Sequence, residues 1–93
     1  MKVKEYIKET FGVDTGIKVK SKSEISRYPF FNIKKTITGT VVAMNNLGDM
    51  MVRVDEYIPE LNERTDNWDN CICYYHHDTD SIEAFKDEWE IIV

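Results

Sequence analysis

The residues best able to do chemistry are two cysteines and two histidines near the C-terminal end of the chain. They follow the pattern Cys71-x-Cys73-x-x-His76-His77, and thiol and imidazole groups are the ligands that zinc prefers. Zinc sites normally pair cysteines two to four residues apart, whereas one residue separates Cys71 from Cys73. We therefore interpret the thiols as small apolar side chains of a core strand and the histidines as a solvated pair. No metal or other cofactor is expected.

Enzyme activity is not indicated elsewhere in the sequence. A nucleophilic cysteine needs a cationic neighbour or a helix N-terminus to lower the pKa of its thiol, but the sequence around Cys71 and Cys73 is acidic. The run from Asp78 to Glu83 lacks the glycine and the spacing of a calcium-binding EF-hand loop. The sequence also contains no glycine-rich phosphate loop and no HExxH motif. We expect no catalytic residues.

A second group of residues is suited to binding. Basic and aromatic side chains interleave between residues 18 and 35, and single-stranded nucleic acid is bound by such sets, because cations attract phosphates and rings stack on bases. The candidate nucleic-acid-binding residues are Lys18, Lys20, Lys22, Arg27, Lys34 and Lys35. The neighbouring Tyr28, Phe30 and Phe31 form an exposed platform in this interpretation. In the alternative they cover the core, where burying an aromatic ring is worth roughly 2–3 kcal/mol.

Charge is distributed unevenly along the chain, which has a net charge of −5. Residues 1–47 contain nine Lys and Arg against four Asp and Glu, whereas residues 48–93 contain three against thirteen. Either basic and acidic strands pair as neighbours and partly neutralise each other, or the acidic surface docks on a basic partner. The acidic total argues against a nucleic-acid-binding domain, because such domains are usually basic.

The segment from Glu56 to Asn70 has no apolar periodicity and is predicted to be a long surface loop. Loops of this length are uncommon in small domains and are often functional. We expect Ile58, Leu61 and Trp68 to anchor it to the core. The candidate residues for binding a partner protein combine acidic positions on this loop with the aromatic segment: Glu60, Glu63, Asp66, Tyr28, Phe30 and Phe31.

The longest predicted element is a β-hairpin between Ile33 and Asp55. Its first arm is rich in β-branched residues, a polar turn containing glycine follows, and Met50–Asp55 alternates between apolar and other residues. Gly39 interrupts the first arm, and a glycine within a strand often marks a bulge or a barrel corner. We therefore expect Ile33–Thr38 and Thr40–Met44 to form two sides of one small barrel.

Further strands are expected where apolar residues alternate or cluster. The predicted strands are Gly16–Lys22, Cys71–Tyr75 and Glu88–Val93. The first would direct Ile17 and Val19 inward and its lysines outward. The last would direct Trp89, Ile91 and Val93 inward.

Helix is expected at two places. Apolar residues at four-residue spacing predict a helix over Lys2–Phe11, and Gly12 would end it in a left-handed conformation. Asp80 and Glu83 have the spacing of a capping box and predict a single helical turn. The segment Ser23–Asn32, which contains the aromatic residues, is expected to be a loop.

These elements predict a mainly β, α+β fold. The 93 residues, 42% of them hydrophobic, are enough for one domain over residues 1–93. It would comprise an N-terminal helix in residues 1–12 and a small antiparallel barrel of five strands, closed or nearly closed, in residues 16–93.

Three stretches resemble a pattern found in small uncharacterised proteins encoded by bacteriophages: Gly39–Val42, Val52–Leu61 and Trp68–Asn70. The resemblance covers residues 39–93 and implies a Src-homology-3-like barrel and a viral origin, with no catalytic residue. Phage proteins of this size and charge frequently bind a host or defence protein. Residues 62–67 lengthen the loop relative to this pattern.

The function expected from the sequence is that of a non-enzymatic, phage-type protein that docks on a host or defence protein. The alternative is a nucleic-acid-binding small barrel. The charged start of the chain differs from a signal peptide, and no apolar stretch approaches the ~20 residues of a membrane span. We therefore expect a cytoplasmic protein, in the host cytosol if it is encoded by a phage, with no membrane partner.

Overall fold

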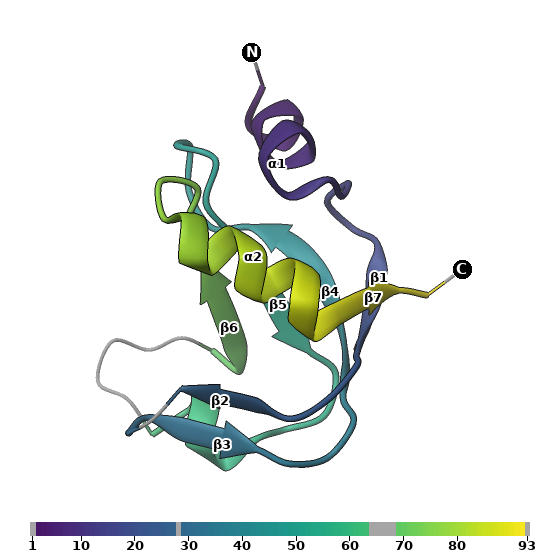
Figure 1. The fold of residues 1–93 in the computed structure, drawn as a ribbon, viewed down its shortest axis with the longest axis vertical. Coiled ribbons are helices and arrows are strands. Elements are labelled where there is room, and N and C mark those ends of the chain that lie inside the picture. Colours follow the sequence, from purple (N-terminus) through teal and green to yellow (C-terminus); the bar gives the residue numbers. More distant parts are fainter. Residues whose placement is uncertain (1, 28, 64–68, 93) are drawn as a thin grey trace.

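The computed structural model describes residues 2–27, 29–63 and 69–92. Its elements in chain order are α1 (Val3–Phe11), β1 (Lys18–Ser21), β2 (Ile25–Arg27), β3 (Phe31–Ile33), β4 (Thr38–Ala43), β5 (Met50–Val54), the 3-10 helix η1 (Pro59–Leu61), β6 (Cys71–Tyr74), α2 (Thr79–Glu88) and β7 (Trp89–Ile91). A five-stranded antiparallel sheet has the order β6–β5–β4–β1–β7, and β2 and β3 form a separate two-stranded sheet (Figure 1). The α+β class and the N-terminal helix are confirmed.

The predicted barrel closure is wrong. Strands β6 and β7 are the two edges of the larger sheet and do not pair with each other. Helix α2 connects these edges and contacts both β6 and β7, and in Figure 1 it passes in front of the sheet. Its ten residues span about 15 Å at 1.5 Å per residue, so the helix separates the two edge strands that a barrel would join.

Gly39 is not a barrel corner, and its surroundings explain why it is glycine. It pairs with Val19 on one side and Val54 on the other, and β4 continues in register to Ala43 opposite Met50. A Cβ on Gly39 would lie 2.5 Å from Cγ1 of Val52 and 2.7 Å from the carbonyl oxygen of Arg53. The glycine therefore permits close strand contact, and the residues before Thr38 do not extend β4.

The hydrophobic core combines residues of the larger sheet, of both helices and of the β2–β3 hairpin. Cross-strand neighbours in this sheet share one face, as in the series Val41, Val52 and Ile72, all of which are buried. From α2, Phe85 packs edge-on against Phe11 of α1 at 5.9 Å and against Tyr74 of β6 at 5.3 Å between ring centroids. Residues distant in the chain thus meet in one hydrophobic cluster.

Helix α1 confirms its prediction. Ile7 and Phe11 are buried, and Val3 packs against the core. Gly12 follows the helix with φ 77°, and its amide donates to the carbonyl of Lys8 at 2.9 Å. None of the helices in the described ranges is both long enough and apolar enough to cross a membrane.

Helix α2 is longer than predicted and begins at a different cap. Asp78 is the N-cap, with its side chain accepting from the amides of Asp80 at 3.0 Å and Ser81 at 3.4 Å. The predicted capping box on Asp80 and Glu83 is wrong because Asp80 already lies in the first turn. Packing of Phe85 in the core stabilises turns that the local sequence alone does not specify.

The segment 23–32 is largely a hairpin, not the predicted loop. Strands β2 and β3 pair Ile25 with Ile33 and Arg27 with Phe31. Phe31 is 5% exposed and belongs to the core, whereas Phe30 is 56% exposed. Phe31 therefore covers the core as one alternative predicted, Phe30 is exposed as the other requires, and Tyr28 lies outside the described residues.

The remaining comparison with the prediction concerns the side chains of β1 and of the edge strand β7. Val19 in β1 and Trp89 in β7 are buried, and Ile17 packs partly against the core, as predicted. Ile91 is 51% exposed although it lies opposite Val19, because β7 is the outer strand of the sheet. Its predicted inward position is wrong, and Val93 lies outside the described residues.

The predicted loop anchors Ile58 and Leu61 are buried at the start and end of η1. A further anchor is the amide of Asn70, which donates to the carbonyls of Val54 at 2.9 Å and Glu56 at 2.8 Å. Its oxygen accepts from the amide of Ile58 at 2.8 Å and from the side chain of Asn62 at 3.0 Å. This side chain holds the two ends of the segment together, whereas Trp68 lies outside the described residues.

Candidate functional site

A largely apolar groove lies between the β2–β3 hairpin and the surface formed by β6 and α2. We call it the aromatic groove, and its volume is about 430 Å³. Its apolar lining comes from Phe30, Phe31, Ile72, Cys73, Tyr75 and Ala84. Phe31 is buried in its floor, whereas Phe30 leaves 56% of its surface accessible. The groove thus brings together two of the predicted partner-binding residues with residues about 40 positions later, which the sequence did not connect.

Charged residues of both the hairpin and the start of α2 line this groove. Asp78 and Asp80, at the start of α2, line it together with Arg27. The Arg27 guanidinium is engaged by Glu88, with contacts of 2.6 Å from Nη1 to Oε2 and from Nη2 to Oε1. The hydrogen bond to Glu88 raises the pKa of Arg27 despite its burial. With Arg27 already paired, the charge left to attract a ligand to the groove is acidic.

A buried polar network fixes the hairpin relative to α2 and β7. Oε1 of Glu88 accepts from the Tyr74 hydroxyl at 2.7 Å, and that hydroxyl accepts from the indole of Trp89 at 2.7 Å. Burial and the nearby Glu88 carboxylate raise the pKa of Tyr74 well above its ordinary value, so the hydroxyl keeps its proton. Arg27 lies 5.7 Å from the centre of the Tyr74 ring. Of these network residues, Arg27 is the one that lines the groove.

The predicted nucleic-acid-binding residues do not all remain available for phosphate. Lys18 pairs with Asp55 at 2.6 Å, Arg27 pairs with Glu88, and Lys35 pairs with Glu56. The Lys22 ammonium donates to the carbonyl of Lys86 at 3.0 Å, while Lys20 and Lys34 are exposed. Each ion pair joins the basic half of the chain to the acidic half, which supports mutual neutralisation as the reason for the charge asymmetry.

The acidic and aromatic parts of the predicted partner-binding set are neighbours in the fold. Glu60 lies in η1 and Glu63 shortly after it, and both are exposed. Helix η1 contacts β3, which begins with Phe31. Acidic side chains therefore lie beside the aromatic hairpin as well as along the groove. Asp66 lies outside the described residues.

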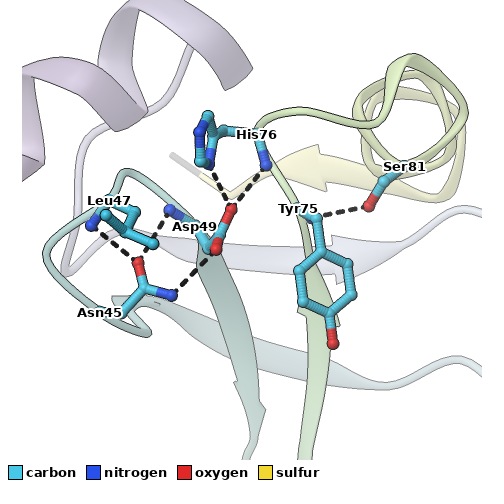
Figure 2. A network of polar contacts seen from close by, with 6 residues as sticks. All are labelled: Asn45, Leu47, Asp49, Tyr75, His76 and Ser81. Carbon is cyan, nitrogen blue, oxygen red and sulfur yellow. Dashed lines mark hydrogen bonds and ion pairs between the residues drawn. The ribbon is translucent and has the colours of Figure 1, made fainter.

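A separate polar cluster forms where the turn before β5 meets the turn after β6 (Figure 2). Oδ1 of Asp49 accepts from the backbone amide of His76 at 2.7 Å and lies 2.5 Å from Nδ1 of the same histidine. Oδ2 accepts from the side chain of Asn45 at 2.9 Å, and Oδ1 of Asn45 accepts from the amide of Leu47 at 2.9 Å. His77 stands edge-on to the His76 ring at 5.4 Å.

The electrostatics of this cluster differ from the prediction. Burial raises the pKa of Asp49, but the hydrogen bonds from Asn45 and His76 outweigh it, so the pKa is lowered and the group is a carboxylate. The prediction that both histidines are simply solvated is wrong for His76. Asp49 was missed because it is 27 positions from His76, and only the pairing of Met50 with Tyr74 brings the two turns together.

The interpretation of core thiols holds for Cys71 and not for Cys73. Both are reduced, but Cys73 is partly exposed and lines the aromatic groove, whereas Cys71 is buried and its thiol donates to the carbonyl of Asp69 at 3.3 Å. Burial raises the pKa of Cys71, which keeps the thiol protonated and disfavours a nucleophilic role.

Comparison of the chain with protein-family models, curated proteins and solved structures returned no match. The bacteriophage resemblance and the Src-homology-3-like fold stay predictions.

Proposed function

We propose that this is a non-enzymatic binding protein that docks on a partner protein through the aromatic groove. The observation that carries the proposal is Phe30, which is 56% exposed at the rim of an apolar groove of about 430 Å³. Aromatic anchors seated in such pockets supply much of the energy of protein interfaces. Arg27 supports this role, because it lines the groove and its ion pair with Glu88 positions it without the partner.

Charge indicates the kind of partner segment that fits. Asp78 and Asp80 line the groove, Glu60 and Glu63 are exposed on the neighbouring segment, and the whole chain carries a net charge of −5. A segment with a large apolar residue next to Lys or Arg would fill the groove and meet the acidic side. The bacteriophage resemblance supports a host or defence protein as the source of that segment.

Nucleic acid is the less supported partner. A phosphate backbone would meet Asp78 and Asp80 beside Phe30, and the ion pairs of Lys18, Arg27 and Lys35 would have to open before these side chains could bind phosphate. Single-stranded binding also falls steeply with salt. A gel shift with single-stranded DNA and RNA at low and moderate salt tests this alternative, and binding lost on Lys20→Glu would favour it.

Quantitative affinity capture from bacterial lysate tests the main proposal when it compares matched variants. Phe30→Ala removes the exposed ring at the groove. Tyr57→Ala removes a ring that is 68% exposed and does not line the groove, which makes it the control. We expect a captured protein to be lost at least ~10-fold on Phe30→Ala, about 1.4 kcal/mol, and to be retained on Tyr57→Ala. Equal capture by both variants would place the interface elsewhere.

A charge variant tests the acidic side. Asp80→Lys reverses one groove charge without removing the Asp78 cap, and Asp87→Lys makes the same change on a residue of α2 that does not line the groove. The first should slow association with the captured partner, and the second should change it much less.

A further inference from the structure

Two turns place three potential metal ligands together, and none of the three is among the residues that line the aromatic groove. Asp49 precedes β5, and His76 and His77 follow β6. One ligand atom from each residue can be chosen so that all lie within 4.8 Å of one another. We propose that Asp49, His76 and His77 bind a divalent transition metal, with zinc the best match to the ligand set.

The ligand chemistry supports this choice. Imidazole nitrogen and carboxylate oxygen are zinc ligands, and three protein ligands leave the fourth tetrahedral position for water or another small ligand. Donor atoms around tetrahedral zinc are about 3.3 Å apart, given metal–ligand distances near 2.0–2.1 Å. Atoms already within 4.8 Å reach that spacing through small side-chain rotations, and the exposed His77 ring has room to make them within its turn.

The carboxylate is held in place before any metal arrives. Asp49 is 5% exposed, and Asn45 and the His76 backbone amide fix its two oxygens from different sides. Oδ1 of Asp49 already lies 2.5 Å from Nδ1 of His76, so a carboxylate oxygen and an imidazole nitrogen are adjacent before a metal binds.

A metal at this location would also affect the stability of the fold. It would connect the β4–β5 turn to the β6–α2 turn, and these two turns are far apart in the chain. Gly48 in the first turn has φ 103°, and a Cβ there would lie 3.2 Å from Cβ of Tyr6 in α1. Binding should therefore stabilise the packing of three elements and raise the free energy of unfolding.

Calorimetric titration of zinc into untagged, EDTA-treated protein tests the proposal. The chain contains only two histidines, so a histidine-dependent site is this one. We expect one zinc per chain and an affinity at least ~10-fold weaker in His77→Ala, whose exposed side chain is not needed for folding. The control variant Cys71→Ala/Cys73→Ala should bind zinc as the parent does.

Equilibrium unfolding provides a second readout. Zinc at 100 times the dissociation constant of the parent should lower the unfolding equilibrium constant of the parent about 100-fold, and that of His77→Ala about tenfold or less. Absence of binding at millimolar zinc, equal binding by His77→Ala, or loss of binding in the cysteine variant would each overturn the proposal. Loss of binding in the cysteine variant would mean that the thiols bind the metal. A thiolate charge-transfer band in the cobalt-loaded protein would show thiol ligation independently.

Discussion

Arg27 and Glu88 are 61 positions apart in the sequence and form a two-pronged ion pair, with both nitrogen–oxygen contacts at 2.6 Å. Their side chains are 30% and 15% exposed, so neither is fully hydrated. The pair attaches β2 to the end of α2, and Arg27 is also one of the residues that line the aromatic groove. It also joins the basic half of the chain to the acidic half, so it neutralises part of the charge difference between them.

Removing both partners of this pair should cost less than the sum of the two single losses. Arg27→Gln leaves the Glu88 carboxylate with only the Tyr74 hydroxyl, and we expect a loss of about 2 kcal/mol in the free energy of unfolding. Urea unfolding of Arg27→Gln, Glu88→Gln and the double variant should give a coupling energy of about 1–2 kcal/mol. Purely additive losses would mean that the two side chains do not stabilise each other.

The carboxyl of Asp55 should titrate at low pH for an identifiable reason. The Lys18 ammonium at 2.6 Å and the Thr38 hydroxyl at 2.7 Å lower its pKa. Because the folded-state pKa lies below the unfolded value of about 3.9, the stabilisation is present above that pH and is lost as pH falls through the folded value. NMR titration of the carboxyl carbon should show its midpoint rising in Lys18→Met. An unchanged midpoint would contradict the ion pair.

Gly39→Ala should destabilise the protein through a steric clash. The added methyl would lie 2.5 Å from Cγ1 of Val52 and 2.7 Å from the Arg53 carbonyl oxygen. We expect a loss of about 1–3 kcal/mol by thermal or urea unfolding. Gly12→Ala is the comparison, since a Cβ there has nothing within 4 Å and only the φ of 77° opposes it. Val52→Ala should partly rescue the Gly39 variant but not the Gly12 variant.

Asn70 should contribute to stability through its side-chain amide. Asn70→Gly keeps a residue suited to φ 62° while removing the hydrogen bonds to Val54, Glu56 and Ile58. We expect a loss of about 2–3 kcal/mol in the free energy of unfolding. Asn62→Ala, which removes bonds only to Ile58 and Asn70, should cost less. A loss in Asn70→Gly below that in Asn62→Ala would contradict its anchoring role.

The correct predictions rest on local patterns. The stripe that buries Ile7 and Phe11 has helical spacing, and Met50, Val52 and Val54 alternate as a strand that buries one face must. Barrel closure failed because residues 79–88 form a helix whose Phe85 packs against Tyr74 and against Phe11, and Phe11 is 74 positions away in the chain. The Asp49–His76 contact likewise follows from strand register and not from any motif.

The proposed function depends on the groove accepting a segment of stated chemistry, and peptide selection tests this directly, whatever the identity of the partner. Random peptides displayed against the immobilised protein should converge on a large apolar residue next to Lys or Arg. Titration of a selected peptide should shift the backbone amide NMR signals of Phe31, Ile72 and Ala84, which line the groove. Phe30→Ala should abolish these shifts, and Tyr57→Ala should preserve them. Selection of no common sequence, or shifts confined to Lys18–Ser21, would contradict the groove as the docking site.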